Sequence, residues 1–206
     1  MLDHSLHIRS EQLAAELAEA FAANPSENTT RVQLTRTSGS LAMEHWAATL
    51  GLLSTGLVSS AAVVHRAQYE AVLRSVWIRY AATDVQLEKL TPDVTMLSAA
   101  AAQNMPQAGD MTKAIDLTAP VPLASALAGF RGNSWKALNS YAHAGLHPIH
   151  HHEVGYAEFL FDAMAKNANG LAMLCAMHVA SLTEHEPFMQ HIHSLQFAYS
   201  ECFAPK

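Results

Sequence analysis

The stretch from Ser59 to Asp84, SSAAVVHRAQYEAVLRSVWIRYAATD, decides the fold. It contains no Pro or Gly, its residues favour helix, and Ser59 or Ser60 is a natural N-cap. Apolar residues at a spacing of three and four form two stripes, which are Tyr69, Val72, Leu73, Val76 and Tyr80 on one side and Val64, Ala71 and Ile78 on another. A helix that is apolar on two sides lies inside a bundle, so we predict a central helix here.

The central helix also carries a row of charged side chains. Arg66, Glu70 and Arg74 follow each other at steps of four, which places them on one side of the helix. Such a row can be a solvated ladder of ion pairs, but the apolar flanks indicate that this one is partly covered. Two arginines against one glutamate leave a surplus positive charge, and a covered charge needs a partner. That partner is either another carboxylate of the chain or an anionic ligand.

Length and composition indicate one folded domain over residues 1–206. Half of the residues are hydrophobic and 15% are charged, which argues against disorder. The formal net charge is -6, and no basic tail or stripe is present, so we expect no broad DNA binding.

Cysteine use and hydropathy point to the cytoplasm. Cys175 and Cys202 lack the CxxC spacing and lie in apolar helical surroundings, as buried thiols of a reducing compartment do. The first ten residues do not resemble a signal peptide. No apolar run reaches the roughly 18 residues that a membrane span needs. We therefore expect a cytoplasmic protein with no disulfide and no membrane segment.

The segment before the central helix predicts a helical hairpin over residues 28–84. Apolar residues recur at helical spacing from about Thr30 to Ser54, either as one helix or as two halves broken at Gly39. Gly56 leaves only a short turn into the central helix, so the two helices should be antiparallel neighbours. A shorter amphipathic helix is expected from Ser10 to Ala23.

The middle of the chain is less regular and predicts short helices. One begins at Pro92, a second is capped by Asp110, and a third covers residues 123–130. No sustained alternation of apolar and polar residues predicts a strand, and the usual nucleotide and hydrolase motifs are absent.

Residues 131–204 predict the C-terminal helices. Ser134 caps a helix that runs to about Ala144, and two longer helices follow, over residues 156–181 and from Pro187 onward. The polar residues within the first of these two, Asn167 and Asn169, contact a partner helix or face a pocket. The fold class is therefore an all-α, up-and-down helical bundle.

A histidine-rich tract lies between these helices. His147, His150, His151, His152 and Glu153 follow Gly145 in a segment that contains Pro148, and we predict a loop there. Imidazole and carboxylate groups are metal ligands, but neither an HExxH motif nor a cysteine pair supports a site. We favour a solvated polar loop and assign no metal and no cofactor.

Three pieces of sequence, RAQYEAVLRSVWIRYAA, WKALNSYAHAGLH and NANGLAMLCAMH, together resemble a bacterial family of unknown function. More distantly, they resemble the HEPN superfamily (higher eukaryote and prokaryote nucleotide-binding domains). Several members of that superfamily are dimeric, metal-independent ribonucleases of toxin and phage-defence systems. The resemblance implies an Arg followed after four to six residues by His at a dimer cleft. Here Lys136 stands in place of the Arg, six residues separate it from His143, and Asn139 lies one turn before that His.

Two functions follow from these patterns, and whether the chain is an enzyme stays open between them. The first is a noncatalytic or regulatory homodimeric module, in which the charged row and His143 form a structural polar network. The second is a HEPN-like ribonuclease or nucleotide-binding protein, with RNA or a nucleotide as its ligand. There His143 would act as an acid and base on the 2′-hydroxyl while an arginine steadies the phosphate. The missing arginine and the acidic balance favour the first.

Overall fold

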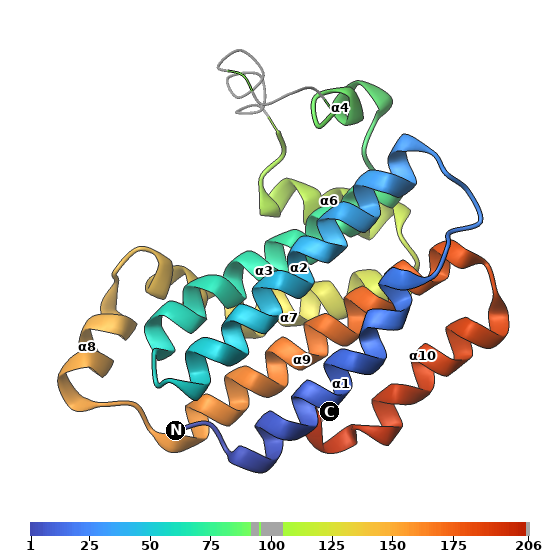
Figure 1. Cartoon of the computed structure of the whole chain (residues 1–206). Helices are drawn as coiled ribbons and strands as arrows, with labels where there is room; N and C mark the ends of the chain where they lie inside the picture. Colours follow the sequence, from blue (N-terminus) through green and yellow to red (C-terminus); the bar gives the residue numbers. More distant parts are fainter. Residues whose placement is uncertain (92–94, 96–104, 205–206) are drawn as a thin grey trace.

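All regular elements in the described part of the chain are helical, which confirms the all-α prediction (Figure 1). The computed structural model describes residues 1–91, 95 and 105–204. The predicted helix at Pro92 begins outside these residues. The helices are α1 His4–Ala22, α2 Thr30–Ser54, α3 Val58–Tyr80, α4 Asp84–Glu88, α6 Ala108–Thr118, α7 Val121–Ala142, α8 Leu146–Val154, α9 Glu158–Ala180 and α10 Glu186–Ala198, with short 3₁₀ turns η1 Ser181–Thr183 and η2 Ser200–Cys202.

The predicted hairpin is formed by α2 and α3, which pack against each other along their length. Gly56 has a φ of +81°, a conformation that glycine adopts without strain, and it reverses the chain between them. The proposed cap at Ser59 or Ser60 is wrong, because α3 begins one residue earlier and Leu57 holds the N-cap position without a side-chain hydrogen bond.

Gly39 does not break α2, which is continuous. Its hydrogen faces α9 instead. A Cβ at this position would lie 3.0 Å from Cγ2 of Val179 and 3.2 Å from Cε1 of Phe21. A larger residue would therefore require these two side chains to shift by a few tenths of an ångström.

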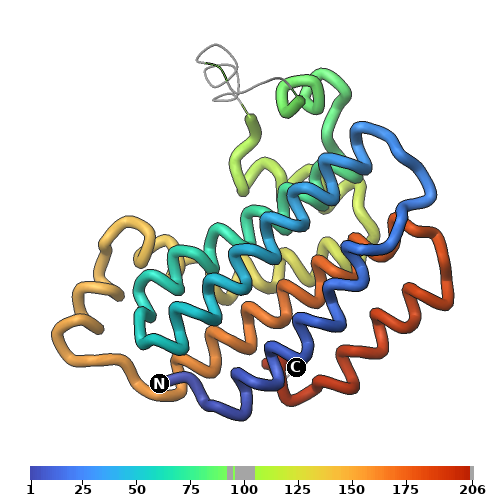
Figure 2. Tube along the Cα trace, in the orientation of Figure 1, coloured from blue at the N-terminus to red at the C-terminus, as the bar shows by residue number. Residues whose placement is uncertain are grey.

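The helix α3 lies at the centre of the bundle, against α2, α6, α7 and α9. Buried residues on three of its sides include Tyr69, Leu73 and Val76, none of which is measurably exposed. A second layer is formed by α1, α9 and α10, which lie side by side (Figure 2). Consequently α3 shows only a narrow strip of its surface, and the charged row lies on that strip.

A buried asparagine joins the layers through three hydrogen bonds. Oδ1 of Asn169, on α9, accepts from Nε1 of Trp46 on α2 at 2.8 Å. Its Nδ2 donates to Oγ of Ser10 on α1 at 2.8 Å and to the carbonyl oxygen of Cys202 in η2 at 2.9 Å. The prediction that this polar residue contacts partner helices is confirmed. Because the site is fully buried, Nε1 of Trp46 and the carbonyl oxygen of Cys202 depend on the amide for their hydrogen bonds, whereas Oγ of Ser10 also donates to the carbonyl oxygen of Leu6.

The predicted division of residues 123–144 into two helices is wrong. The helix α7 runs through both segments without a break, so Ser134 is not an N-cap. Gly132 lies inside the continuous helix. A Cβ at this position would meet no atom within 4 Å, and the exposed glycine is tolerated inside a helix that is held by its other face.

The histidine tract is also helical rather than a loop. It forms α8, which begins after Gly145 and ends at Gly155, whose φ is +89°. The predicted start residues of two other helices are also wrong. The first helix begins at His4 with Asp3 as its cap, and α6 begins with Gln107 rather than Asp110 in the N-cap position.

We predict that Asn169→Ala lowers the free energy of unfolding by roughly 3 kcal/mol or more, because it leaves Nε1 of Trp46 and a backbone carbonyl buried without a partner. Asn167→Ala is the matched control on the same helix, since its half-buried side chain makes no hydrogen bond with the described residues. Urea unfolding of both variants measures the difference. Equal losses in the two variants would contradict the role of the Asn169 amide.

Candidate functional site

The charged row on α3 lies half-buried at the junction with α6 and α7. Nη2 of Arg66 donates to Oε1 of Glu70 at 2.9 Å, and the two side chains are 25% and 38% exposed. An ion pair with this exposure stabilises a protein by about 1 kcal/mol or less. The pair therefore orders the row without carrying much of the stability of the fold.

Two guanidinium groups lie over the ring of Trp135 on α7. The Cζ atoms of Arg66 and Arg131 lie 5.0 and 5.5 Å from the ring centroid of Trp135. Arg131 also donates from Nη1 to Oγ1 of Thr112 on α6, at 3.0 Å. These cation–π and hydrogen-bond contacts hold both arginines in place.

Arg74, like Arg66, makes one hydrogen bond and one cation–π contact. Its Nη2 donates to the carbonyl oxygen of Pro106 at 3.2 Å, and its Cζ lies 5.4 Å above the ring of Trp77. Its Nη1 is buried and meets no hydrogen-bond acceptor among the described residues. Burial lowers the pKa of Arg74, and the charge of Glu70 opposes this shift. Arg74 remains a cation, and its Nη1 has no hydrogen-bond acceptor among the described residues.

A pocket of about 230 Å³ opens beside Arg74. It is lined by Glu70, Arg74, Met105, Pro106, Gln107, Ala108 and Met111. The N-terminus of α6 forms one wall, and no side chain caps its free amides. Free amides and the helix dipole attract anions. Asp110, in the first turn of α6, lies 3.7 Å from Nζ of Lys113 and is strongly exposed.

Three cationic side chains lie near Glu70. The guanidinium groups of Arg66, Arg74 and Arg131 lie at the junction of α3, α6 and α7, and the carboxylate of Glu70 lies among them. The carboxylate of Glu70 is already paired with Arg66. Arg74 forms no ion pair with a carboxylate among the described residues.

The other predicted residues lie toward the end of α7, apart from the row. Lys136 and His143 are exposed, and His143 is the residue that ends α7. It follows Trp135 by eight residues, which corresponds to about 12 Å along the helix axis. Asn139 is half-buried, and its Oδ1 meets no donor among the described residues. Within one chain, the structure does not bring His143 to the arginines.

Sequence reasoning missed Arg131 as a member of the cluster. Arg131 and Trp135 are four residues apart and therefore lie on one side of α7. The expected helix start at Ser134 left Arg131 outside the helix that carries Trp135. The wall formed by Pro106 and Gln107 has no sequence signal, because it is made by backbone atoms that tertiary packing brings to Arg74.

The histidines of α8 take part in ring stacking. His151 stacks between Tyr141 and Tyr156, at centroid distances of 6.5 and 5.1 Å. Tyr156 in turn forms a hydrogen bond with Ser59. These contacts attach α8 to the beginning of α3.

Fold and site define an all-helical protein with a half-buried arginine cluster at a helix junction. The chain belongs to a family of unknown function, DUF6988, whose model matches residues 39–205. This confirms the expected membership in a family of unknown function. No curated protein and no solved structure matches the chain. None of the helices among the described residues combines the length and hydropathy that a bilayer crossing requires.

Two histidines are buried in the bundle. Nδ1 of His65 lies 2.9 Å from Oε1 of Gln68, whose Nε2 donates to the carbonyl oxygen of Ala168. Burial lowers the pKa of His65 from 6.5 to about 4, and the hydrogen bond to Gln68 opposes the shift. Burial likewise lowers the pKa of His178 from 6.5 to about 4, and Arg79 adds to the effect. Both imidazoles are therefore neutral at pH 7.

We predict that acid destabilises the fold through these two histidines. Between pH 6.5 and 4 the unfolded chain binds protons at His65 and His178 while the folded chain does not. The free energy of unfolding therefore falls with pH, by up to roughly 3 kcal/mol for each histidine. Urea unfolding at pH 7 and pH 4.5 should show a smaller acid loss for His178→Leu than for the wild type. An exposed control, His193→Leu, should match the wild type. Equal acid losses in all three proteins would contradict the assignment.

Proposed function

We propose that the protein is a noncatalytic, regulatory helical module that binds a small anion in the pocket beside Arg74. The observation that carries this proposal is the buried Nη1 of Arg74, which meets no acceptor among the described residues. It borders a pocket that the N-terminus of α6 also lines. A phosphate or carboxylate group offers the acceptor and the negative charge that this place lacks.

Charge and size support the same ligand class. A half-buried guanidinium that has no carboxylate partner among the described residues loses solvation, and a bound anion offsets that loss. The pocket of about 230 Å³ is smaller than the clefts of about 300–1,000 Å³ that hold drug-sized ligands. Glu70, which lines the pocket, excludes anions that approach from its own side. We therefore infer that one anionic group enters, rather than a nucleic-acid backbone.

We predict that the protein binds inorganic phosphate and that Arg74→Gln raises the Kd at least tenfold, because it removes the unpartnered donor and its charge. Arg79→Gln is the matched control, since Arg79 lies on the same helix and does not line the pocket. Isothermal titration calorimetry at low ionic strength measures both. Absence of phosphate binding by the wild type, or equal Kd values for the two variants, would overturn the proposal.

The alternative is a HEPN-like ribonuclease, which the sequence resemblance implies. His143 is exposed, as a catalytic histidine at a dimer cleft would be. Its distance from the arginine cluster along α7 gives this alternative less support. We expect no cleavage of single-stranded RNA by the wild type. If the wild type cleaves RNA and His143→Ala does not, the noncatalytic proposal is wrong and the protein is a ribonuclease.

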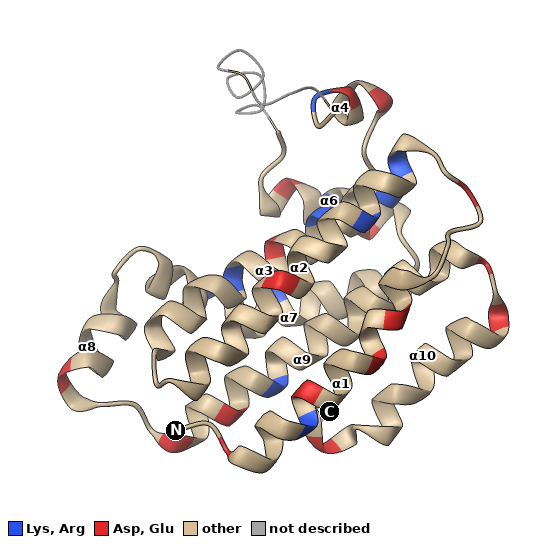
Figure 3. Ribbon diagram, in the orientation of Figure 1, with Lys and Arg blue, Asp and Glu red and all other residues tan. Residues whose placement is uncertain are grey.

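We further propose that two copies pair through α8. Leu146, Ile149 and Val154 are 77%, 62% and 64% exposed, and Phe159, at the start of α9, is 69% exposed. Apart from its histidines, α8 carries Glu153 as its single ionisable residue (Figure 3). An apolar surface with little charge is self-complementary, so a second copy covers it by twofold symmetry.

We predict a dimer at micromolar concentration and a monomer for Ile149→Asp, because a carboxylate in an apolar interface loses its solvation. Val85→Asp is the control, since Val85 is similarly exposed, at 63%, but lies on α4. Size-exclusion chromatography with light scattering gives the masses. A monomeric wild type, or a dimer in Ile149→Asp, would exclude pairing through α8.

The cellular compartment that we propose is the cytoplasm. Cys175 and Cys202 are free and buried. Burial raises the pKa of Cys175 to about 12, so its thiol stays protonated and unreactive. Such thiols suit a reducing compartment.

A further inference from the structure

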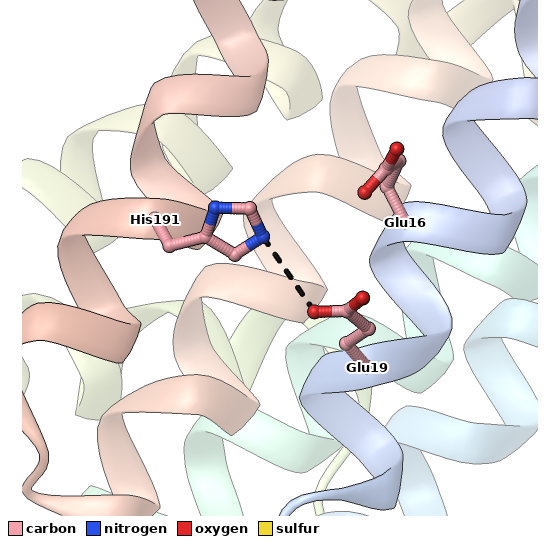
Figure 4. Close-up of side chains that lie close together, drawn as sticks. All are labelled: Glu16, Glu19 and His191. Atoms are coloured by element: carbon pink, nitrogen blue, oxygen red, sulfur yellow. Dashed lines mark ion pairs between the residues drawn. The ribbon is translucent and has the colours of Figure 1, made fainter.

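Three metal-ligating side chains from opposite ends of the chain meet on the outer surface of the second layer (Figure 4). Glu16 and Glu19 lie three residues apart on α1, so both project from one face of that helix toward α10. His191 projects from α10 toward them, with its Nε2 3.5 Å from Oε2 of Glu19. One ligand atom from each residue lies within 4.8 Å of the others.

The core fixes the backbone beneath these side chains. Leu17 directly follows Glu16 on α1, and Ile192 directly follows His191 on α10. Both are fully buried in the same hydrophobic cluster. The two helices are thus held in register, while Glu19 and His191 keep the freedom of exposed side chains. Small rotations suffice to bring the three ligand atoms onto one ion.

The two carboxylates lack a fixed cation. No lysine or arginine among the described residues forms an ion pair with Glu16 or Glu19. Glu19 pairs with His191 only when that imidazole carries a proton. A divalent ion would replace the proton, bind the neutral imidazole and neutralise both carboxylates at once.

We propose that Glu16, Glu19 and His191 form a zinc site with three protein ligands and a water molecule in the fourth position. One imidazole and two carboxylates suit Zn²⁺, which binds such ligands at about 2.0–2.2 Å, whereas Mg²⁺ and Ca²⁺ prefer oxygen ligands alone. Tetrahedral binding at these lengths separates the ligand atoms by about 3.4 Å. The site needs a contraction of the present group and no movement of the helices.

The proposed ion joins α1 to α10. The family match begins at residue 39, so α1 lies outside the matched part of the chain and α10 lies inside it. An ion that binds only the folded protein stabilises the contact between them by mass action. Zinc would then control how firmly α1 is held on the bundle, independently of the anion pocket.

The test must separate this site from the histidines of α8, because the chain contains 13 histidines. We therefore use a background in which His150, His151 and His152 are replaced by Ala. Titration calorimetry with Zn²⁺ should show one site per chain in this background. Glu16→Gln and His191→Ala should each raise the Kd at least tenfold. The thermal midpoint should rise with zinc in the background and not in His191→Ala.

His193→Ala is the matched control, since His193 is exposed on the same helix and does not belong to the ligand group. It should leave the Kd unchanged. Equal Kd values for His191→Ala and His193→Ala would mean an adventitious ion only and would overturn the proposal. Absence of zinc binding in the background would overturn it as well. Circular dichroism confirms that each variant is folded, which these surface changes should permit.

Discussion

The enclosure of α3 is the constraint on which the rest of the structure depends. Four helices pack against it, so its side chains are buried on three sides and only one strip reaches the surface. Charged residues on such a strip are neither fully solvated nor fully buried. Glu70 and Trp135 contact Arg66 in this environment, but among the described residues Nε of Arg66 and Nη1 of Arg74 both remain without a hydrogen-bond acceptor. The architecture of the bundle therefore creates the polar imbalance from which we infer the anion pocket.

Buried amides make the packing around this helix specific. Asn169 connects α9 to α1 and α2, and Gln68 connects α3 to the backbone of α9 at Ala168. An apolar core alone tolerates shifts of one helix along another, but a buried hydrogen bond is satisfied in one register only. Gly39 acts in the same direction, because it allows α2 and α9 to approach closely at one level. The position of α3, and with it the position of Arg74, is fixed by these contacts.

The sequence predicted the long helices well, because their apolar periodicity and lack of Pro and Gly are local properties. The prediction failed at residue types that occur both inside helices and outside them. The expected helix start at Ser134 is wrong, and Gly132 lies inside α7, whereas Gly145 and Gly155 do bound α8. Tertiary packing distinguishes these glycines. The buried Leu127 and Leu138 hold α7 together across Gly132, whereas a glycine at a helix end interrupts no such packing. Histidines also have no strong preference against helix, so the tract of α8 could not be assigned from composition.

The same division applies to the candidate site. The spacing of Arg66, Glu70 and Arg74 predicted the row and its surplus charge, since steps of four define one face of a helix. Which arginine stays without a carboxylate was not predictable, because Pro106, Gln107 and Arg131 reach the row from more than 30 residues away in sequence. The free energy of unfolding of Arg74→Met in phosphate-free buffer tests the central claim most directly. We predict a change of less than about 1 kcal/mol, or a gain, because the substitution removes an undercompensated charge that serves a ligand. A clearly larger loss of stability would contradict this account and make Arg74 a structural residue.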